Sequence, residues 1–148
     1  MRIAAFLAVL SGCSGTADRG GLDALKQTEV TLPGGERIAC EMMLTAPDWQ
    51  RGMMYRESLA PDRGMLFLYG ESAQRNMWMH NVKIPLDIIW LNKDRVIVGI
   101  LANAPPCLIE DSTRCPQYST RENSQFVLEL AGGMAAKYGL AKGQTIRF

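Results

Sequence analysis

The chain has little net charge and lacks most of the sequence motifs that mark catalysis. Its 148 residues include 16 basic and 15 acidic side chains, so the excess positive charge that supports nucleic-acid binding is missing. It contains no glycine-rich phosphate loop, no Cys-x-x-Cys pair and no Gly-x-Ser-x-Gly elbow. A single histidine, His80, excludes a two-histidine metal site within one chain. The sequence therefore argues against a nucleic-acid partner and favours a binding role over an enzyme.

The composition, 47% hydrophobic and 21% charged, is that of one globular domain. Seven prolines and 14 glycines favour many turns over long helices. The strand pattern predicts strands at 28–32, 36–44, 65–69, 75–79, 86–91, 95–102, 126–130 and 144–148, with short helices at 45–52 and 132–138. Segments 86–91 and 95–102 are apolar on both faces, so we expect both to be central. The pattern predicts a mainly β fold with short helices, a compact sandwich-like or barrel-like single domain over residues 28–148.

Residues 1–12 have the pattern of a signal peptide. Arg2 is followed by a short apolar run and then by Ser11, Gly12 and Cys13. Small residues before a cysteine resemble the bacterial lipoprotein signal, in which that cysteine is lipidated and becomes the new N-terminus; a plain secretory signal is the alternative. Residues 13–27 would then be the lipidated cysteine and a flexible tether. We expect an exported protein that lipid on Cys13 attaches to the periplasmic face of the cell envelope.

Three cysteines remain for the exported domain. Cys107 and Cys115 flank a short polar loop, and an exported compartment permits disulfides, so we expect these two to pair. Cys40 alternates with Ile38 and Met42, which predicts a buried thiol in a strand rather than a reactive or metal-binding one.

Two carboxyl groups lie within apolar strands. Asp87 precedes Ile88 and Ile89, where an ionised group must be paired or hydrogen-bonded. It is either a binding or acid–base carboxylate or an anchor that accepts backbone hydrogen bonds. Glu129 has a similar position, for which we expect solvation at a strand edge. If the two carboxyl groups meet in a cleft, they would form a hydrolytic pair.

Methionines are concentrated in one part of the chain. Met77 and Met79 lie close in sequence to His80, Met53 belongs to the same methionine-rich stretch, and thioether and imidazole ligands suit Cu(I). The alternative is that these methionines fill gaps in a small core. A copper site would use Met53, Met77, Met79 and His80; otherwise we expect neither a metal nor a cofactor.

Several motifs together resemble the domain of unknown function 192 family. They are Gly52-Met53-Met54, Gly64-Met65-Leu66-Phe67, Trp78-Met79-His80-Asn81, Ile84-Pro85-Leu86-Asp87-Ile88-Ile89 and Val127-Leu128-Glu129-Leu130-Ala131-Gly132, and the resemblance runs from about residue 30 to 148. The resemblance implies a small β-sandwich-like domain that is often exported. It does not imply any particular activity. Relatives more often carry Lys at the position of His80, so a role for His80 would be particular to this chain.

The polar positions within these motifs give a candidate site. We expect a non-catalytic domain that binds a small ligand or an envelope protein in a cleft lined by Trp78, Met79, Asn81 and Asp87. The whole candidate set is Arg56, Trp78, Met79, Asn81, Asp87 and Glu129. The alternatives are periplasmic Cu(I) handling and a hydrolase that uses Asp87 and Glu129.

Overall fold

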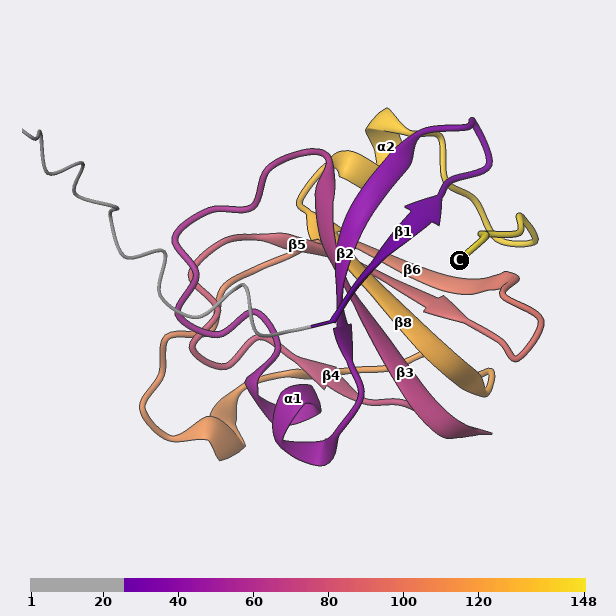
Figure 1. The fold of residues 1–148 in the computed structure, drawn as a ribbon. Helices are drawn as coiled ribbons and strands as arrows, with labels where there is room; N and C mark the ends of the chain where they lie inside the picture. The colour runs from indigo at the N-terminus through magenta and orange to yellow at the C-terminus, as the bar shows by residue number, and fades with distance from the viewer. Residues whose placement is uncertain (1–25) are drawn as a thin grey trace, which may run out of the picture.

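The fold is a mixed sheet of six strands with a two-stranded sheet beside it (Figure 1). The computed structural model describes residues 26–148, so the signal peptide, Cys13 and nearly all of the tether lie outside the described residues. The elements are β1 (Gln27–Thr31), β2 (Arg37–Met43), α1 (Ala46–Arg51), β3 (Arg63–Ala73), β4 (Met77–Trp78), β5 (Leu86–Leu91), β6 (Ile97–Ala104), η1 (Ser112–Arg114), β7 (Gln117–Tyr118), β8 (Ser124–Ala131) and α2 (Met134–Lys137). The expected mainly β domain with short helices is confirmed.

The large sheet has the strand order β1-β2-β3-β8-β5-β6. Neighbouring strands are antiparallel except β2 and β3, which are parallel and joined by a crossover that contains α1. Thr45 starts α1 as predicted: its side chain accepts from the Asp48 N–H, and the Asp48 carboxylate accepts from the Thr45 N–H at 3.0 Å. Gly52, at φ 41°, ends the helix.

The C-terminal segment connects the two edges of this sheet. The Thr31 and Arg147 backbones exchange hydrogen bonds of 2.8 and 3.0 Å next to β1, and the Ile97 N–H of β6 donates to the Gln144 carbonyl at 2.9 Å. The strand expected at 144–148 is therefore present as short bridges that curl the sheet into a barrel-like form. Strand β5 is central as predicted, but β6 is the last strand of the order, which corrects the expectation that both are central. The beginning of β6 can be apolar because the C-terminal segment hydrogen-bonds to the buried Ile97 there.

Each face of the sheet has its own core. Aliphatic side chains fill the face that the C-terminal segment closes; they include Val30, Ile38, Leu66, Ile89, Leu128 and Ile146. The opposite face carries methionines and aromatic side chains, among them Met43, Met53, Met65, Phe67, Met77 and Trp90. Figure 1 shows α1 and β4 at one end of the molecule and α2 at the other. Trp49 of α1 and Met77 of β4 pack within the methionine-rich core, so this face of the sheet is the one next to α1 and β4.

A disulfide lies within the loop that leads to β7. Cys107 and Cys115 are bonded, as the sequence predicts, and Cys40 is buried and not in a disulfide in the described part of the chain. The loop contacts the β4 segment at two successive points: β7 pairs with β4, and the Cys107 N–H donates to the carbonyl of Met79, the residue after β4, at 3.1 Å. Of the strand expected at 75–79, only β4 forms. None of the helices within residues 26–148 is long and apolar enough to span a bilayer.

Candidate functional site

Asp87 has a structural role. Its carboxylate accepts three backbone hydrogen bonds, from Asn103 at 2.8 Å, Gly133 at 3.1 Å and Ala135 at 2.6 Å. The side chain is fully buried, so these donors replace its hydration. Asp87 thereby joins β5 to the end of β6 and to the start of α2. Of the two roles considered for Asp87, the structure shows the anchor.

Glu129 lies on the methionine-rich face. In the sheet register Glu129 of β8 lies between Met65 of β3 and Ile88 of β5, and Met65 in turn pairs with Glu41 of β2. Neighbours in register point to the same face, so Glu41 and Glu129 flank Met65. Glu129 is 3% exposed, which corrects the expectation of a solvated strand edge. Strand β8 is central because β3 and β5 cover both of its edges.

The Glu129 carboxyl group is not fully hydrogen-bonded. Its Oε2 atom has no hydrogen-bond partner within the described residues. Burial raises the pKa of Glu129 from 4.5 to about 8, and the charge of Arg56 opposes that rise. At neutral pH the group is therefore mainly a neutral acid that can donate a hydrogen bond into its surroundings.

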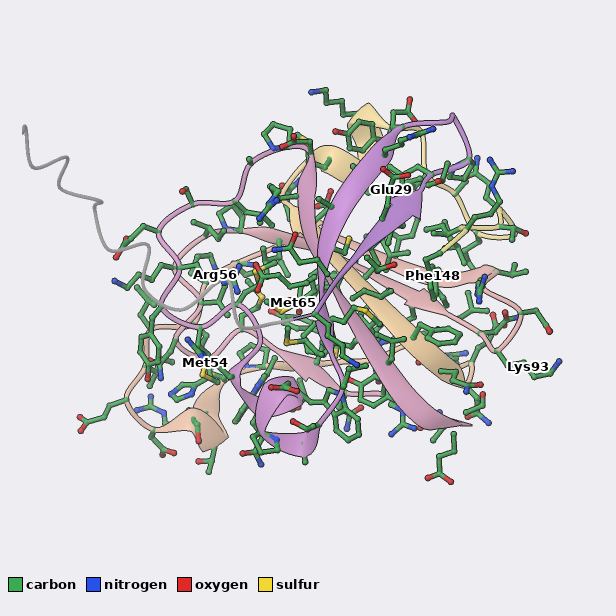
Figure 2. The ribbon with its side chains drawn as sticks, in the orientation of Figure 1. Glu29, Met54, Arg56, Met65, Lys93 and Phe148 are labelled. Atoms are coloured by element: carbon green, nitrogen blue, oxygen red, sulfur yellow. A yellow bond between two sulfur atoms is a disulfide. The ribbon has the colours of Figure 1, made fainter. Side chains whose placement is uncertain are left out.

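Arg56 is engaged by a carboxylate that the sequence analysis missed. Its two terminal nitrogens each lie 2.6 Å from an oxygen of Glu41, a bidentate ion pair with little exposure. Glu41 is 4% exposed, and Met43, two positions later, is buried on the same face. The sequence signal for a buried Glu41 was that β2 carries apolar residues on both faces, so that a charged residue within it is buried on either face. Figure 2 labels Arg56 and also Met65, the register neighbour of Glu41.

The structure does not bring Asp87 and Glu129 together. Asp87 pairs in register with Leu130, the residue after Glu129, so the two carboxyl groups point to opposite faces of the sheet. The proposed hydrolytic pair is absent for this geometric reason. The cleft expected between Trp78 and Asp87 is also absent, because Asp87 is fully buried and faces the start of α2.

Trp78 instead lies between two open hollows, which we call the Trp78 groove. One hollow has a volume of about 430 Å³ and is lined by Ala46, Trp49, Gln50, Tyr69, Gln74, Arg75, Asn76, Met77, Trp78 and Gln117. The other has about 490 Å³ and is lined by Pro47, Gln50, Arg51, Met54, Tyr55, Trp78, His80 and Asn81. Gln50 and Trp78 belong to both, so α1 and β4 form the two walls of one groove. Volumes of this size suit small ligands.

A small inner cavity lies behind Trp78. Its volume is about 20 Å³, and Trp78, His80, Met53, Met77 and Glu129 are among its lining residues. A cavity needs roughly 10–15 Å³ to hold one water, so this space has room for one water molecule or one ion. Glu129 lines this cavity together with Gln50 and Trp78, which also line both hollows of the Trp78 groove.

The methionines divide between this cavity and the core. Met53, Met54 and Met77 line the cavity together with His80, whereas Met79 is fully buried and does not line it. Strand β4 ends at Trp78, so Met79 no longer shares a strand face with Met77 as the sequence suggested. No group of three or more His, Cys, Asp or Glu side chains within residues 26–148 could hold a metal ion.

The rim of the groove contains two residues in the left-handed region. Tyr55 has φ 65° and Asn81 has φ 56°, a conformation that residues other than glycine seldom adopt. The Tyr55 N–H donates to the Asn81 carbonyl at 2.8 Å, and the Asn81 amide donates to the Tyr55 hydroxyl at 2.9 Å. These two bonds offset the strain and fix Asn81 on the rim.

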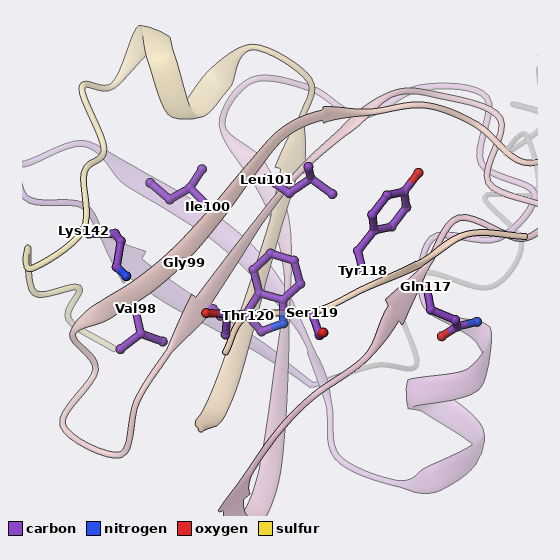
Figure 3. Close-up of a pocket in the computed structure, with 10 residues that line it drawn as sticks. Val98, Gly99, Ile100, Leu101, Gln117, Tyr118, Ser119, Thr120 and Lys142 are labelled. Carbon is purple, nitrogen blue, oxygen red and sulfur yellow. The ribbon is translucent and has the colours of Figure 1, made fainter. Parts of the chain in front are cut away.

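A further hollow lies along β6, on the other side of β4 and β7. It has about 450 Å³ and is lined by Trp90, Val98, Gly99, Ile100, Leu101, Gln117, Tyr118, Ser119, Thr120 and Lys142 (Figure 3). No buried polar group without a partner faces it among the described residues. The Trp78 groove, with Glu129 behind it, is therefore the stronger candidate.

The candidate site thus keeps Trp78, Asn81 and Glu129 from the sequence-based set. Arg56 is paired beside it, Met79 is buried beneath it, and Asp87 is elsewhere. Lining residues on α1 and β3 were not expected from the sequence; among them are Trp49, Gln50, Arg51, Tyr69 and Phe67. The tryptophan at position 49, within a predicted short helix, was the available signal.

These features define a small mainly β domain with an aromatic groove at one end. The family model of the domain of unknown function 192 family, described as an uncharacterized ACR, matches residues 28–148. The chain belongs to this family. No curated protein matches the chain.

Two solved structures are similar over most of the chain. A protein of unknown function from Novosphingobium aromaticivorans DSM 12444 is 31% identical, with a TM-score of 0.74, over 84% of this chain and 86% of its own. A protein from Sinorhizobium meliloti 1021, which its name proposes as a transcription regulator, is 30% identical, with a TM-score of 0.75, over 86% of this chain and 97% of its own. These likenesses agree with the fold.

Proposed function

We propose that this protein is a non-catalytic binding domain of the cell envelope whose site is the Trp78 groove. The observation that carries the proposal is that two ligand-sized hollows share Gln50 and Trp78, and that these two residues also line the small cavity with the buried, partly unpaired Glu129. The other two buried carboxylates, Glu41 and Asp87, are fully engaged by Arg56 and by backbone N–H groups. This engagement is the reason for favouring binding over catalysis.

The lining favours a neutral ligand with ring faces and hydroxyl groups, that is, a saccharide. Three aromatic side chains line the hollow of about 430 Å³. The same hollow is lined by one charged residue and by four amide side chains, Gln50, Gln74, Asn76 and Gln117. Aromatic faces pack against the C–H face of a sugar ring, and amides both donate to and accept from hydroxyl groups. The name of the Sinorhizobium protein suggests a different role, but the helices described here have six and four residues, too short for a recognition helix.

A titration with N,N′-diacetylchitobiose, a neutral disaccharide, tests the ligand class. We expect saturable quenching of tryptophan fluorescence that is lost in Gln50→Ala and Trp78→Ala and is kept in Thr120→Ala, which changes the separate hollow along β6. If the disaccharide and cellobiose both leave the fluorescence of the full chain unchanged at millimolar concentration, the saccharide proposal is wrong.

The envelope location is proposed from the N-terminal sequence alone. Residues 1–12 would direct export, and lipid on Cys13 would hold the domain at the periplasmic face, with residues 13–27 as its tether. We expect Cys13→Ala to move the protein from the membrane fraction to the soluble exported fraction. Equal membrane recovery of the two proteins after a carbonate wash would rule out the lipid anchor.

A further inference from the structure

The inner cavity behind Trp78 has a size and a set of side chains that point to a single ion. Its volume of about 20 Å³ is far below that of either hollow of the groove, so it cannot hold a sugar or another organic ligand. Methionines line it from two segments, Met53 and Met54 after α1 and Met77 in β4, together with His80. Residues with soft or imidazole donor groups, from separate parts of the chain, thus line one space of about the size of an atom.

The donor types select the ion. Thioethers are soft, uncharged ligands that favour Cu(I), and imidazole also binds copper, whereas Mg²⁺ and Ca²⁺ need several oxygen ligands. We propose that the inner cavity is a Cu(I) site formed by Met53, Met77 and His80, with the Trp78 ring over it. This proposal does not depend on saccharide binding in the groove.

Two connections hold these donors in place. Met77 pairs with Tyr118 of β7, and His80 forms a bridge with Cys107, so the disulfide-bonded loop fixes both. The Trp78 and His80 rings are 5.4 Å apart, centroid to centroid. The Asn81 amide lies 3.4 Å from the His80 Nδ1 atom, which can orient the ring while Nε2 remains for the ion. A prepared donor set of this kind lowers the cost of ordering ligands on binding.

Two neighbouring groups provide matched controls. Met79 is as buried as Met53 but does not line the cavity, so Met79→Leu changes a methionine without changing the proposed ligands. The Tyr69 hydroxyl lies 3.8 Å from the Met77 sulfur, a contact that an ion would compete with. Tyr69→Phe removes that competitor and should not weaken copper binding. Met→Leu changes conserve volume, so these variants should remain folded.

The test is an anaerobic competition titration of the full chain in detergent against a chromophoric Cu(I) chelator. Cys13→Ser and Cys40→Val are introduced first to remove both thiols, which would bind Cu(I) on their own. We expect one Cu(I) per chain and X-ray absorption showing sulfur and nitrogen neighbours. Loss of a residue that only supports a ligand costs about 10–100-fold in metal affinity, so Met53→Leu, Met77→Leu and His80→Gln should each cost at least about 100-fold.

The same titration can overturn the proposal. Met79→Leu and Tyr69→Phe should stay within a few-fold of the parent, and circular dichroism should show that every variant is folded. An absence of binding in the thiol-free chain, or equal weakening by Met79→Leu and Met53→Leu, would show that these methionines serve the core alone. Binding that remains in the Met53→Leu and Met77→Leu variants would place the ion elsewhere and would also reject the site.

Discussion

At the scale of single residues, Asp87 is the side chain whose hydrogen bonds connect the most separate segments of the chain. Its three backbone partners would lose their acceptor in Asp87→Ala, and an unpaired buried donor costs about 1–3 kcal/mol. We expect the free energy of unfolding to fall by roughly 3 kcal/mol or more, measured by urea denaturation. Asp87→Asn keeps one acceptor oxygen and should cost less. The exposed Asp94→Ala is the control; a similar small loss for both alanine variants would contradict the anchoring role.

Glu129 should make stability fall as the pH rises. Its pKa is about 8 in the folded protein against 4.5 for an ordinary glutamate, so between these values the folded state holds a proton that the unfolded state has released. Each pH unit in that window should cost on the order of 1 kcal/mol of unfolding free energy, with no further loss above about pH 8. Glu129→Gln should flatten this dependence, and thermal melts at pH 5 and pH 8 measure it. The exposed Glu122→Gln should leave it unchanged.

At the scale of elements, the disulfide-bonded loop positions the groove. Cys107 and β7 contact opposite ends of the segment that carries Trp78 and His80. The double variant Cys107→Ser, Cys115→Ser should cost roughly 2–3 kcal/mol in the chain-entropy account. Hydrogen exchange should become faster at residues 77–81 while β5 and β8 keep their protection. Uniform loss of protection across the large sheet would show that the loop supports the whole fold instead.

At the scale of the whole molecule, the C-terminal segment closes the sheet. Ile146 is fully buried among the aliphatic side chains between the two edges of the sheet. Ile146→Ala should lower the free energy of unfolding by about 2–5 kcal/mol, because the cavity that it leaves lies where the edges meet. The neighbouring, exposed Thr145→Ala should change it by less than about 0.5 kcal/mol. Equal effects in calorimetry would mean that the closure contributes little.

The sequence by itself determined most strands of the large sheet, the short capped helix, the disulfide and the burial of Cys40. These depend on local pattern: alternation sets which face a side chain takes, Thr45 and Asp48 can cap only a helix that starts between them, and Cys107 and Cys115 are close in the chain. The signal peptide and Cys13 remain predictions from sequence.

Only the tertiary structure decided which residues meet. Strand order placed Glu129 beside Met65 and Glu41, and one step of register turned Asp87 to the other face. The end of β4 after Trp78 separated Met79 from Met77 and left Met77 with Met53 and His80 around one cavity. The physical reason is that pairing between distant strands is set by the packing of the whole sheet, which no local segment of the chain contains.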